Sequence, residues 1–185
     1  MSGQFLQSDR VVLRAPEPSD VDFMFHIEND ARMWVASSCK APYSRYHLKR
    51  YISENSHDIY TDKQLRLMIE ERATHSLVGI VDLFDYAPAH HRAEVGIVVA
   101  ADSRGKGYAT EALALLCDYA AGILNVHQLY AYVYSGNAAS LRLFERCNFV
   151  NIATLEDWGY SNGKYHDACL FQRVFSSLEG GKWAK

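Results

Sequence analysis

A glycine turn between a strand-like and a helix-like segment places the strongest constraint on this fold. Residues 92–100 before the turn form an apolar, partly alternating run that is typical of a strand. Gly105 and Gly107 then flank Lys106, and an apolar stripe at helical spacing follows, made of Ala109, Ala112, Leu113, Leu116 and Ala120. The first N–H groups of a helix have no acceptor and carry partial positive charge. With Arg104 and Lys106 alongside, the turn predicts a bound anion, while a glycine-stabilised loop with solvated basic residues is the alternative.

The same periodicities divide the rest of the chain. Strands are predicted at residues 10–14, 64–71, 77–86, 92–100, 127–135, 149–158 and 166–175. Helices are predicted to begin at or after Ser19, Ser44, Gly107 and Asn137, with Ser19 and Asn137 as candidate N-caps. The short turn at 73–76 joins the second and third strands as an antiparallel hairpin. Antiparallel strands followed by strands linked through helices are typical of an α+β fold.

Composition narrows the class of protein. The 185 residues suffice for one domain, predicted over residues 1–175, with a flexible tail at 176–185. A net charge of -3 with scattered basic residues argues against a nucleic-acid partner. Four cysteines without a CxxC pair favour reduced thiols in a cytoplasmic protein and predict neither a disulfide framework nor a metal site. Neither a signal peptide nor an apolar run of membrane-spanning length is recognisable, so no membrane partner is expected.

Two common nucleotide-binding patterns do not fit the turn. A Rossmann site needs a third glycine where this chain has Thr110, and an acidic residue about twenty residues on, where residues 127–134 offer none. A Walker loop needs Ser or Thr directly after Gly-Lys, whereas Gly107 follows Lys106 here. The anion is therefore expected to come from another class of ligand.

The turn instead resembles the acetyl-CoA pyrophosphate loop of the GNAT N-acetyltransferases. Its residues Arg104-x-x-Gly107-x-Ala109 match the family pattern Arg/Gln-x-x-Gly-x-Gly/Ala. Residues 137–149 resemble the second motif of the family, in which an Asn opens a short helix that ends in a Gly-Phe or similar pair. The resemblance covers roughly residues 77–175 and is closest to the spermidine/spermine N-acetyltransferases, with the ribosomal-protein N-terminal acetyltransferases next.

This resemblance implies a fold and a set of residues that would hold acetyl-CoA as cosubstrate. The fold would be a mixed, mostly antiparallel twisted sheet of about seven strands with about four flanking helices, splayed at its central strands. A backbone N–H of Ile97, Val98 or Val99 would polarise the thioester carbonyl, an effect worth about 3 kcal/mol per donor. The pyrophosphate would be held by Arg104, Gly105, Lys106, Gly107, Tyr108 and Ala109. Asn137 would contact the cofactor arm, although a plain N-cap role fits it equally well.

The reaction implied is direct attack of an amine on acetyl-CoA, which benefits from a base. An alkyl amine with a pKa near 10 is neutral in only about one molecule in a thousand at pH 7. Glu94 is the leading base candidate, because it lies in the strand before the cofactor loop and alternates with Ala93 and Val95. A solvated edge carboxylate is the alternative interpretation of Glu94. The weaker base candidates are His91, Tyr86 and Asp82.

One departure from the family concerns the acid that protonates the leaving thiolate. Many members carry Tyr on the second-motif helix, but the matching residue here is Phe144, which would line the cofactor site and cannot donate a proton. Tyr134 is therefore the candidate acid, with Ser140 as an alternative. The thiolate can also leave unaided, since a thiol pKa of about 8.5 makes it a fair leaving group. Asn148 replaces the usual glycine and can adopt the left-handed conformation that ends a helix.

The acceptor is expected between the first two helices and the strand edges. Acidic residues there would suit a polyamine, although acids on helices are usually just solvated faces: Glu28, Asp30, Glu54, Asp58, Asp82, Asp85, Glu156 and Asp157. Aromatic residues could bind an alkyl ammonium or belong to the core: Trp34, Tyr43, Tyr46, Tyr86 and Trp158. Three functions follow, led by a small-amine acetyltransferase of polyamine type. The others are a protein N-terminal acetyltransferase and a non-catalytic acyl-CoA-binding domain. Homo-oligomerisation is a further expectation, with the apolar last strand, 168–175, as its interface.

Overall fold

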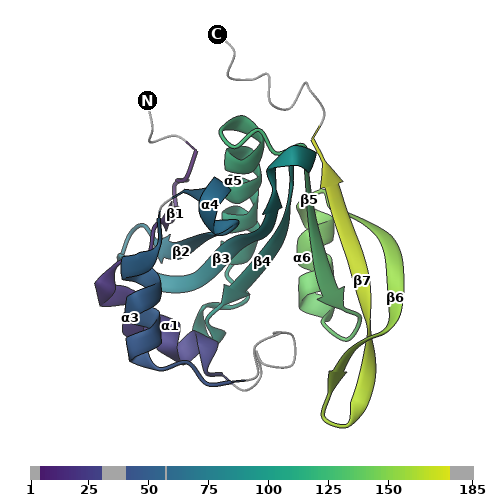
Figure 1. The fold of residues 1–185 in the computed structure, drawn as a ribbon, viewed down its shortest axis with the longest axis horizontal. Helices are drawn as coiled ribbons and strands as arrows, with labels where there is room; N and C mark the ends of the chain where they lie inside the picture. Colours follow the sequence, from purple (N-terminus) through teal and green to yellow (C-terminus); the bar gives the residue numbers. More distant parts are fainter. Residues whose placement is uncertain (1–4, 31–40, 57, 176–185) are drawn as a thin grey trace.

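A computed structural model describes residues 5–30, 41–56 and 58–175, and it places seven strands in one sheet (Figure 1). The strands are β1 (Val11–Arg14), β2 (Leu65–Glu71), β3 (Ser76–Ala87), β4 (Arg92–Val99), β5 (Gln128–Tyr134), β6 (Val150–Ser161) and β7 (Lys164–Val174). Their order is β1-β2-β3-β4-β5-β7-β6. Among these strands β4 and β5 form the one parallel pair, and the other neighbours are antiparallel. The predicted α+β fold with its mostly antiparallel sheet is confirmed.

The parallel pair divides the sheet into two halves that diverge. β4 pairs with β5 at only three positions, residues 92–94 against 128–130. Beyond these positions β4 continues along β3, while β5 continues along β7, and the opening between the halves is visible in Figure 1. Parallel strands need a long crossover connection, and α5 (Tyr108–Gly122) supplies it here. The splay predicted at the central strands is confirmed.

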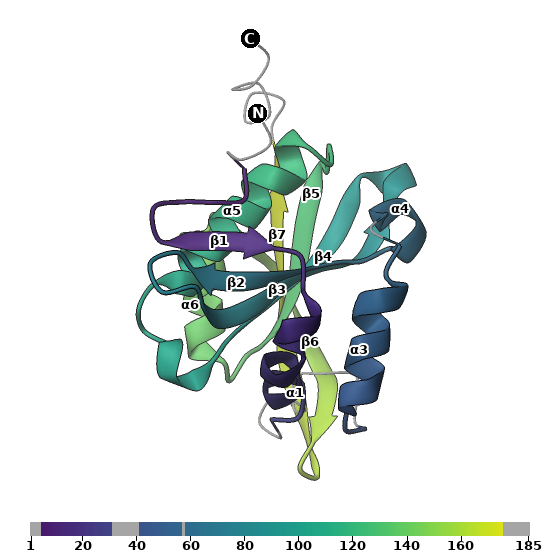
Figure 2. The same ribbon diagram turned by 90° about the vertical axis from the view of Figure 1, so that its left-hand side faces the viewer.

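Helices cover both faces of the sheet. The described residues form five α-helices, namely α1 (Val21–Glu28), α3 (Arg45–Glu54), α4 (Ile59–Asp62), α5 and α6 (Ala138–Arg146). α5 and α6 lie on one face, and α1 and α3 pack together on the other (Figure 2). The sequence predicted about four helices, and the single turn α4 is the addition. None of the helices in the described ranges is long and apolar enough to span a membrane.

Each face of the sheet has its own apolar core. Leu113 and Leu116 of α5 are fully buried in the larger core, together with alternate side chains of β1 to β5. Met24 of α1 and Leu48 of α3 are buried against Met68 of β2 in the smaller core. Burying one such side chain contributes about 1.5–3 kcal/mol. Successive residues of the central strands therefore face different helices, which fixes the face on which each polar side chain lies.

Side chains cap α3 and α6, and the cap predicted at Asn137 is confirmed. The Ser44 hydroxyl accepts a hydrogen bond from the N–H of His47 at 3.1 Å at the start of α3. The Asn137 side-chain oxygen accepts one from the N–H of Ser140 at 3.1 Å at the start of α6. Asn137 is therefore an N-cap, and its contact with the cofactor arm stays a prediction that its amide NH2 would have to make. Asn148 has a φ of 62°, as its left-handed role requires.

The predicted cap of the first helix is wrong. Ser19 lies inside a short 3-10 turn, Pro18–Asp20, and Asp20 is the N-cap residue of α1. The carboxylate of Asp20 reaches backwards, where it accepts from the N–H of Glu17 at 2.7 Å and from Arg14 at 2.7 Å. The start of α1 therefore lies at Asp20, whose carboxylate is bound by Glu17 and by Arg14 at the end of β1, and Ser19 provides no cap.

The last strand is not available as an interface. β7 contains the apolar run and lies between β5 and β6, and its residues Ala168 and Phe171 are buried. Because partners occupy both sides of its backbone, the prediction that this strand forms an oligomer interface is wrong. The connector residues Trp34 and Cys39 and the predicted tail at 176–185 lie outside the described residues.

Candidate active site

The glycine turn after β4 leaves the first N–H groups of α5 open to a ligand. Gly107 is the N-cap residue of this helix, and without a side chain it cannot cap it. The N–H of Glu111 is the first to bond within the helix, to the Gly107 oxygen at 3.2 Å. Gly105 and Gly107 have φ values of 76° and 88°, a left-handed path that favours glycine. The N–H groups of residues 108–110 therefore form an anion site of the kind that binds phosphate.

Basic side chains hold the backbone of this turn in place. Arg104 donates from Nε to the Val99 oxygen at 3.0 Å. Arg10 donates from Nη2 to the Lys106 oxygen at 2.8 Å, and its guanidinium lies 5.0 Å from the centre of the buried Tyr108 ring. The turn is thus fixed both to the end of β4 and to the residue before β1. Its predicted pyrophosphate-binding groups are preorganised, and Arg10 is a supporting residue that sequence analysis missed.

Backbone groups of β4 face the opening between the two halves of the sheet. The N–H of Ala100 donates to a carbonyl of β3 at 2.9 Å. N–H groups point to alternate sides along a strand. The N–H of Val98 is therefore directed at β3, and those of Ile97 and Val99 are directed into the opening. Of the three predicted donors, Ile97 and Val99 are placed to reach a ligand there.

Glu94 lies where the two halves begin to diverge. Its neighbours Ala93 and Val95 are buried in the core beneath α5, so Glu94 points to the face that carries α1 and α3. β4 has a partner on both sides at this residue, so Glu94 is not on a sheet edge. Burial raises the pKa of Glu94 from 4.5 to about 7, and the nearby Asp85 carboxylate adds to the shift. A carboxylate with this pKa is well matched to accept a proton near neutral pH.

Asp85 and Tyr130 complete the group around Glu94. Asp85 has a φ of 50° and lies where the β3–β4 register shifts between Phe84 and Ala87. Tyr130 is the register partner of Glu94 on β5, and its hydroxyl donates to Asp85 Oδ2 at 2.6 Å. Burial and this hydrogen bond raise the pKa of Tyr130. Sequence analysis counted Asp85 only among the acids and missed Tyr130, although the alternation of YAYVY places three tyrosines on one face of a strand.

Tyr134 and Phe144, the two residues considered in connection with the leaving thiolate, lie away from Glu94. Tyr134 comes four residues after the partner of Glu94, about 13 Å along β5 at 3.3 Å per residue. Its ring packs over Gly159, where an added Cβ would clash with the tyrosine ring and hydroxyl. Phe144 is 3% exposed and packs edge-to-face on Phe149 with ring centres 5.1 Å apart. Tyr134 and Glu94 are thus not brought together, and the ring of Phe144 belongs to the core beneath α6.

The weaker base candidates are engaged in other interactions. Both carboxylate oxygens of Asp82 accept from Arg66, at 2.8 and 2.9 Å. Tyr86 is 4% exposed, and burial raises its pKa to about 12. His91 lies in an exposed turn, with Nδ1 3.0 Å from a backbone oxygen. Among these candidates Glu94 has the environment that suits a base. The described residues contain no group of His, Cys, Asp and Glu arranged to hold a metal ion.

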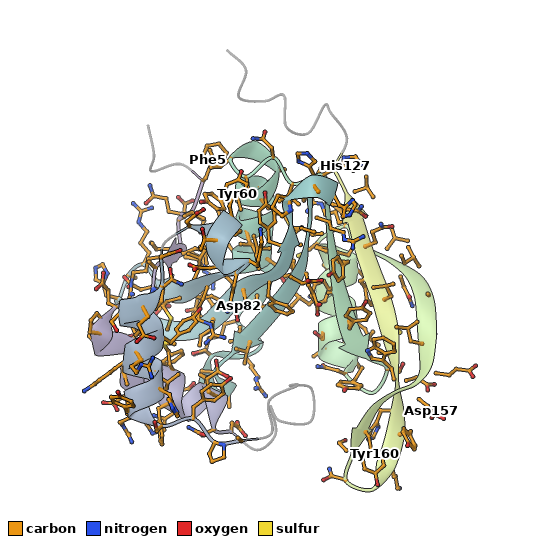
Figure 3. The ribbon with its side chains drawn as sticks, viewed as in Figure 1. Phe5, Tyr60, Asp82, His127, Asp157 and Tyr160 are labelled. Atoms are coloured by element: carbon orange, nitrogen blue, oxygen red, sulfur yellow. The ribbon has the colours of Figure 1, made fainter. Side chains whose placement is uncertain are left out.

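A buried ion-pair network lies on the face that carries Glu94. Arg66 of β2 forms ion pairs with Asp82 of β3 at 2.8 Å and with Glu28 of α1 at 2.6 Å. Figure 3 labels Asp82 near the centre of the sheet. The Arg66 guanidinium also lies 5.4 Å from the ring centre of Tyr51 on α3. Arg66 is only 16% exposed, so its charge needs these partners. Glu28 and Asp82, two of the acids considered for a polyamine, therefore already bind Arg66.

The remaining acids do not converge on one cleft in the described structure. Glu54 pairs with Arg50 on α3, and Asp58 caps α4. Glu156 and Asp157 are exposed on β6 beside Trp158, and Figure 3 shows Asp157 at the outer margin of the molecule. Acidic character near Glu94 thus comes mainly from Asp85. The acidic cleft expected between the first two helices is therefore not formed by these residues, because the fold distributes them over several elements.

A separate cavity of about 260 Å³ lies between α3, α4 and the C-terminal end of α5. Apolar side chains dominate its lining, among them Ile52, Ile59, Leu65 and Leu124. It contains neither Glu94 nor a residue of the glycine turn, so we assign it no part in the chemistry.

A splayed parallel strand pair, together with a glycine turn that opens a helix N-terminus, defines an acyltransferase of the GNAT class. The family model described as Acetyltransferase (GNAT) domain matches residues 10–150, and the chain belongs to this family. It is an acetyl-CoA-dependent N-acetyltransferase.

Spermidine acetyltransferases are among its relatives. The chain is 29% identical over 161 residues to spermidine N(1)-acetyltransferase of Vibrio cholerae serotype O1, over 86% of this chain and 90% of the relative. The crystal structure of spermidine N-acetyltransferase from Vibrio cholerae with CoA and spermine has a TM-score of 0.79 and 27% identity, over 90% of this chain and 96% of that one. A dodecameric structure of spermidine N-acetyltransferase from Vibrio cholerae has a TM-score of 0.76 and 29% identity, over 90% and 95%.

Proposed function

We propose that this enzyme transfers the acetyl group of acetyl-CoA to a primary amine of a polyamine. The observation that carries the proposal is the pair of carboxylates, Glu94 and Asp85, at the point where β4 and β5 diverge. A partly buried carboxylate beside a second one suits a cationic acceptor that must lose a proton there. The spermidine acetyltransferases among its relatives, one of them with CoA and spermine bound, support the same class of acceptor.

In this proposal Glu94 acts as the general base. It accepts a proton from the ammonium group, directly or through water, and the amine nitrogen then bonds to the thioester carbon. The N–H groups of Ile97 and Val99 are candidates to stabilise the negative charge that develops on the carbonyl oxygen, each worth about 3 kcal/mol. The nitrogen then gives up its second proton to water or to the departing sulfur, the carbon–sulfur bond breaks, and coenzyme A leaves as its thiolate or thiol while the neutral amide remains.

The glycine turn would hold the cofactor's pyrophosphate. Backbone N–H groups from Gly105 to Ala109 and the charges of Arg104 and Lys106 would contact it, and the side chain of Tyr108 would keep the turn in place through its packing against Arg10. A thiolate with a pKa near 8.5 can leave without an acid. Tyr134 therefore stays a candidate acid that the reaction does not require, and Phe144 serves the core.

A thiol-release assay tests the proposal. Acetyl-CoA would be offered with spermidine, with an alkyl monoamine, with a peptide bearing a free N-terminus, or with no acceptor. We expect release of coenzyme A with spermidine, at a kcat/KM well above that for the peptide. Preference for the peptide would favour the N-terminal acetyltransferase alternative. Tight acetyl-CoA binding with no acceptor-dependent release would favour a non-catalytic binding domain.

We also propose that the chain forms a homo-oligomer. The dodecameric structural neighbour supports assembly, while the interior position of β7 requires surfaces other than that strand. Light scattering at assay concentrations measures the stoichiometry, and a monomer would refute the proposal.

A further inference from the structure

We infer that Tyr132 and Trp158 form a cation–π subsite that binds the second ammonium group of the acceptor while its primary amine lies beside Glu94. This inference rests on the proposed function and deepens it, because it names the residues that distinguish a polyamine from a monoamine. It concerns an aromatic pair on β5 and β6 that the chemistry of acetyl transfer does not itself use.

The pair continues the row of groups that begins at Glu94. Tyr130 is the register partner of Glu94, and its ring centre lies 5.9 Å from that of Tyr132. Tyr132 in turn stacks on Trp158, with ring centres 5.3 Å apart and planes inclined by 19°. Leu129 and Ala131 are buried beneath α5, so Tyr130 and Tyr132 share the opposite face, the one to which Glu94 points. An extended chain with a propyl or butyl spacer can follow these rings from the carboxylates outward.

The backbone of β6 is irregular at the place that presents Trp158. The β6–β7 register shifts between Leu155 and Gly159, and Asp157 within this bulge has a φ of 50°. The N–H of Asp157 donates to Asp167 Oδ1 at 3.0 Å, which holds the bulge to β7. Bulges re-aim side chains and are frequent beside active sites. Here the bulge belongs to an edge strand, and its tryptophan lies over a ring of β5, two strands away in the sheet.

The exposure and charge of the pair suit a cation. Trp158 is 55% exposed and Tyr132 is 39% exposed, so the stack presents ring surface to solvent. The cation–π pairs formed by the described residues use other rings, such as Tyr108 and Tyr51, and none of them uses this stack. Tryptophan is the strongest of the aromatic side chains in this interaction. The exposed carboxylates of residues 156 and 157 directly precede Trp158 in the chain.

Steady-state kinetics on matched variants test the inference. Trp158→Ala should raise KM for spermidine roughly 3- to 30-fold, the range expected for loss of one cation–π contact. The kcat, the KM for acetyl-CoA and the KM for an alkyl monoamine should change less than about twofold. Trp158→Phe should have a spermidine KM much closer to that of the wild type than to that of Trp158→Ala, because it keeps an aromatic face. Tyr160→Ala is the control, since Tyr160 is 60% exposed on the same strand but packs on Tyr165.

Each outcome decides between the inference and its competitors. An unchanged spermidine KM in Trp158→Ala, while the wild type turns over spermidine, overturns the subsite and leaves the proposed function intact. Absence of spermidine turnover in the wild type rejects the proposed function, and the subsite with it. Equal loss for monoamine and polyamine would reject a contact of Trp158 with the second ammonium group. A change of oligomeric state by light scattering would instead assign the stack to an interface between copies of the chain. Equal effects of Trp158→Ala and Tyr160→Ala would reject the specific role of Trp158.

Discussion

Replacing Glu94 by Gln tests the centre of the proposed mechanism, because it removes the charge and keeps the shape. Loss of a general base typically costs about 100- to 10,000-fold in rate, so kcat should fall at least about tenfold even if water partly substitutes. The pKa of Glu94 rises from 4.5 to about 7 on folding. If the enzyme binds the ammonium form of the acceptor, kcat/KM of the wild type should rise tenfold per pH unit below pH 7, because Glu94 must be deprotonated to act as base. Above pH 7 it should level off. The Gln variant should lack this bend.

Stability gives an independent measurement on the same variant. A group whose pKa is raised in the folded state stabilises the protein below its unfolded pKa, and this contribution is lost as pH rises through the folded value. A tenfold change in the acid dissociation constant of Glu94 corresponds to about 1.4 kcal/mol of folding free energy. Because Glu94 is partly exposed, we reduce the summed penalty of burying its charge to about 2 kcal/mol. Glu94→Gln should therefore be about 2 kcal/mol more stable than the wild type at pH 8 and nearly equal at pH 4.5.

Urea unfolding at the two pH values measures the difference in stability, and thiol release between pH 5.5 and 9 measures the rate profile. A bend near pH 7 that persists in the Gln variant would refute Glu94 as the base. Equal stability of the two proteins at pH 8 would refute the claim that burial penalises its charge. Unchanged KM for acetyl-CoA is the control that the cofactor site remains intact.

Substitutions at three further positions, Gly107, Asn137 and Arg66, test the cofactor turn, a helix cap and the ion-pair network. Gly107→Ala should weaken acetyl-CoA binding in calorimetry and lower stability by about 1–2 kcal/mol, because Gly107 has a φ of 88°; normal affinity would contradict the assigned anion site. Asn137→Ala should cost about 1 kcal/mol through loss of the cap, and Asn137→Ser should recover that stability. Failure of the serine variant to recover acetyl-CoA affinity would support the cofactor contact of Asn137, and full recovery would limit it to capping. Arg66→Met should cost about 3–5 kcal/mol in urea unfolding, because it leaves Asp82 buried without its partner, whereas Arg50→Met on the exposed surface should change little.

Local sequence patterns determined the elements and the cofactor turn. Alternation along 92–99 and helical spacing after Gly107 predicted β4 and α5, because side-chain burial repeats with the period of the backbone. The sequence also predicted the turn at Gly105 and Gly107 and the cap at Asn137, because a left-handed backbone or a cap depends on a few adjacent residues. The resemblance to the GNAT family added the expected splay between the central strands.

Tertiary structure alone decided which side chains meet. Asp85 joins Tyr130 across the sheet, and Trp158 stacks on Tyr132, because bulges in β3 and β6 shift the register by amounts that no local pattern encodes. The same long-range packing turned Phe144 into the core. Periodicity fixes the face of a strand, whereas register fixes the neighbour, and for this protein the proposed acceptor site depends on register.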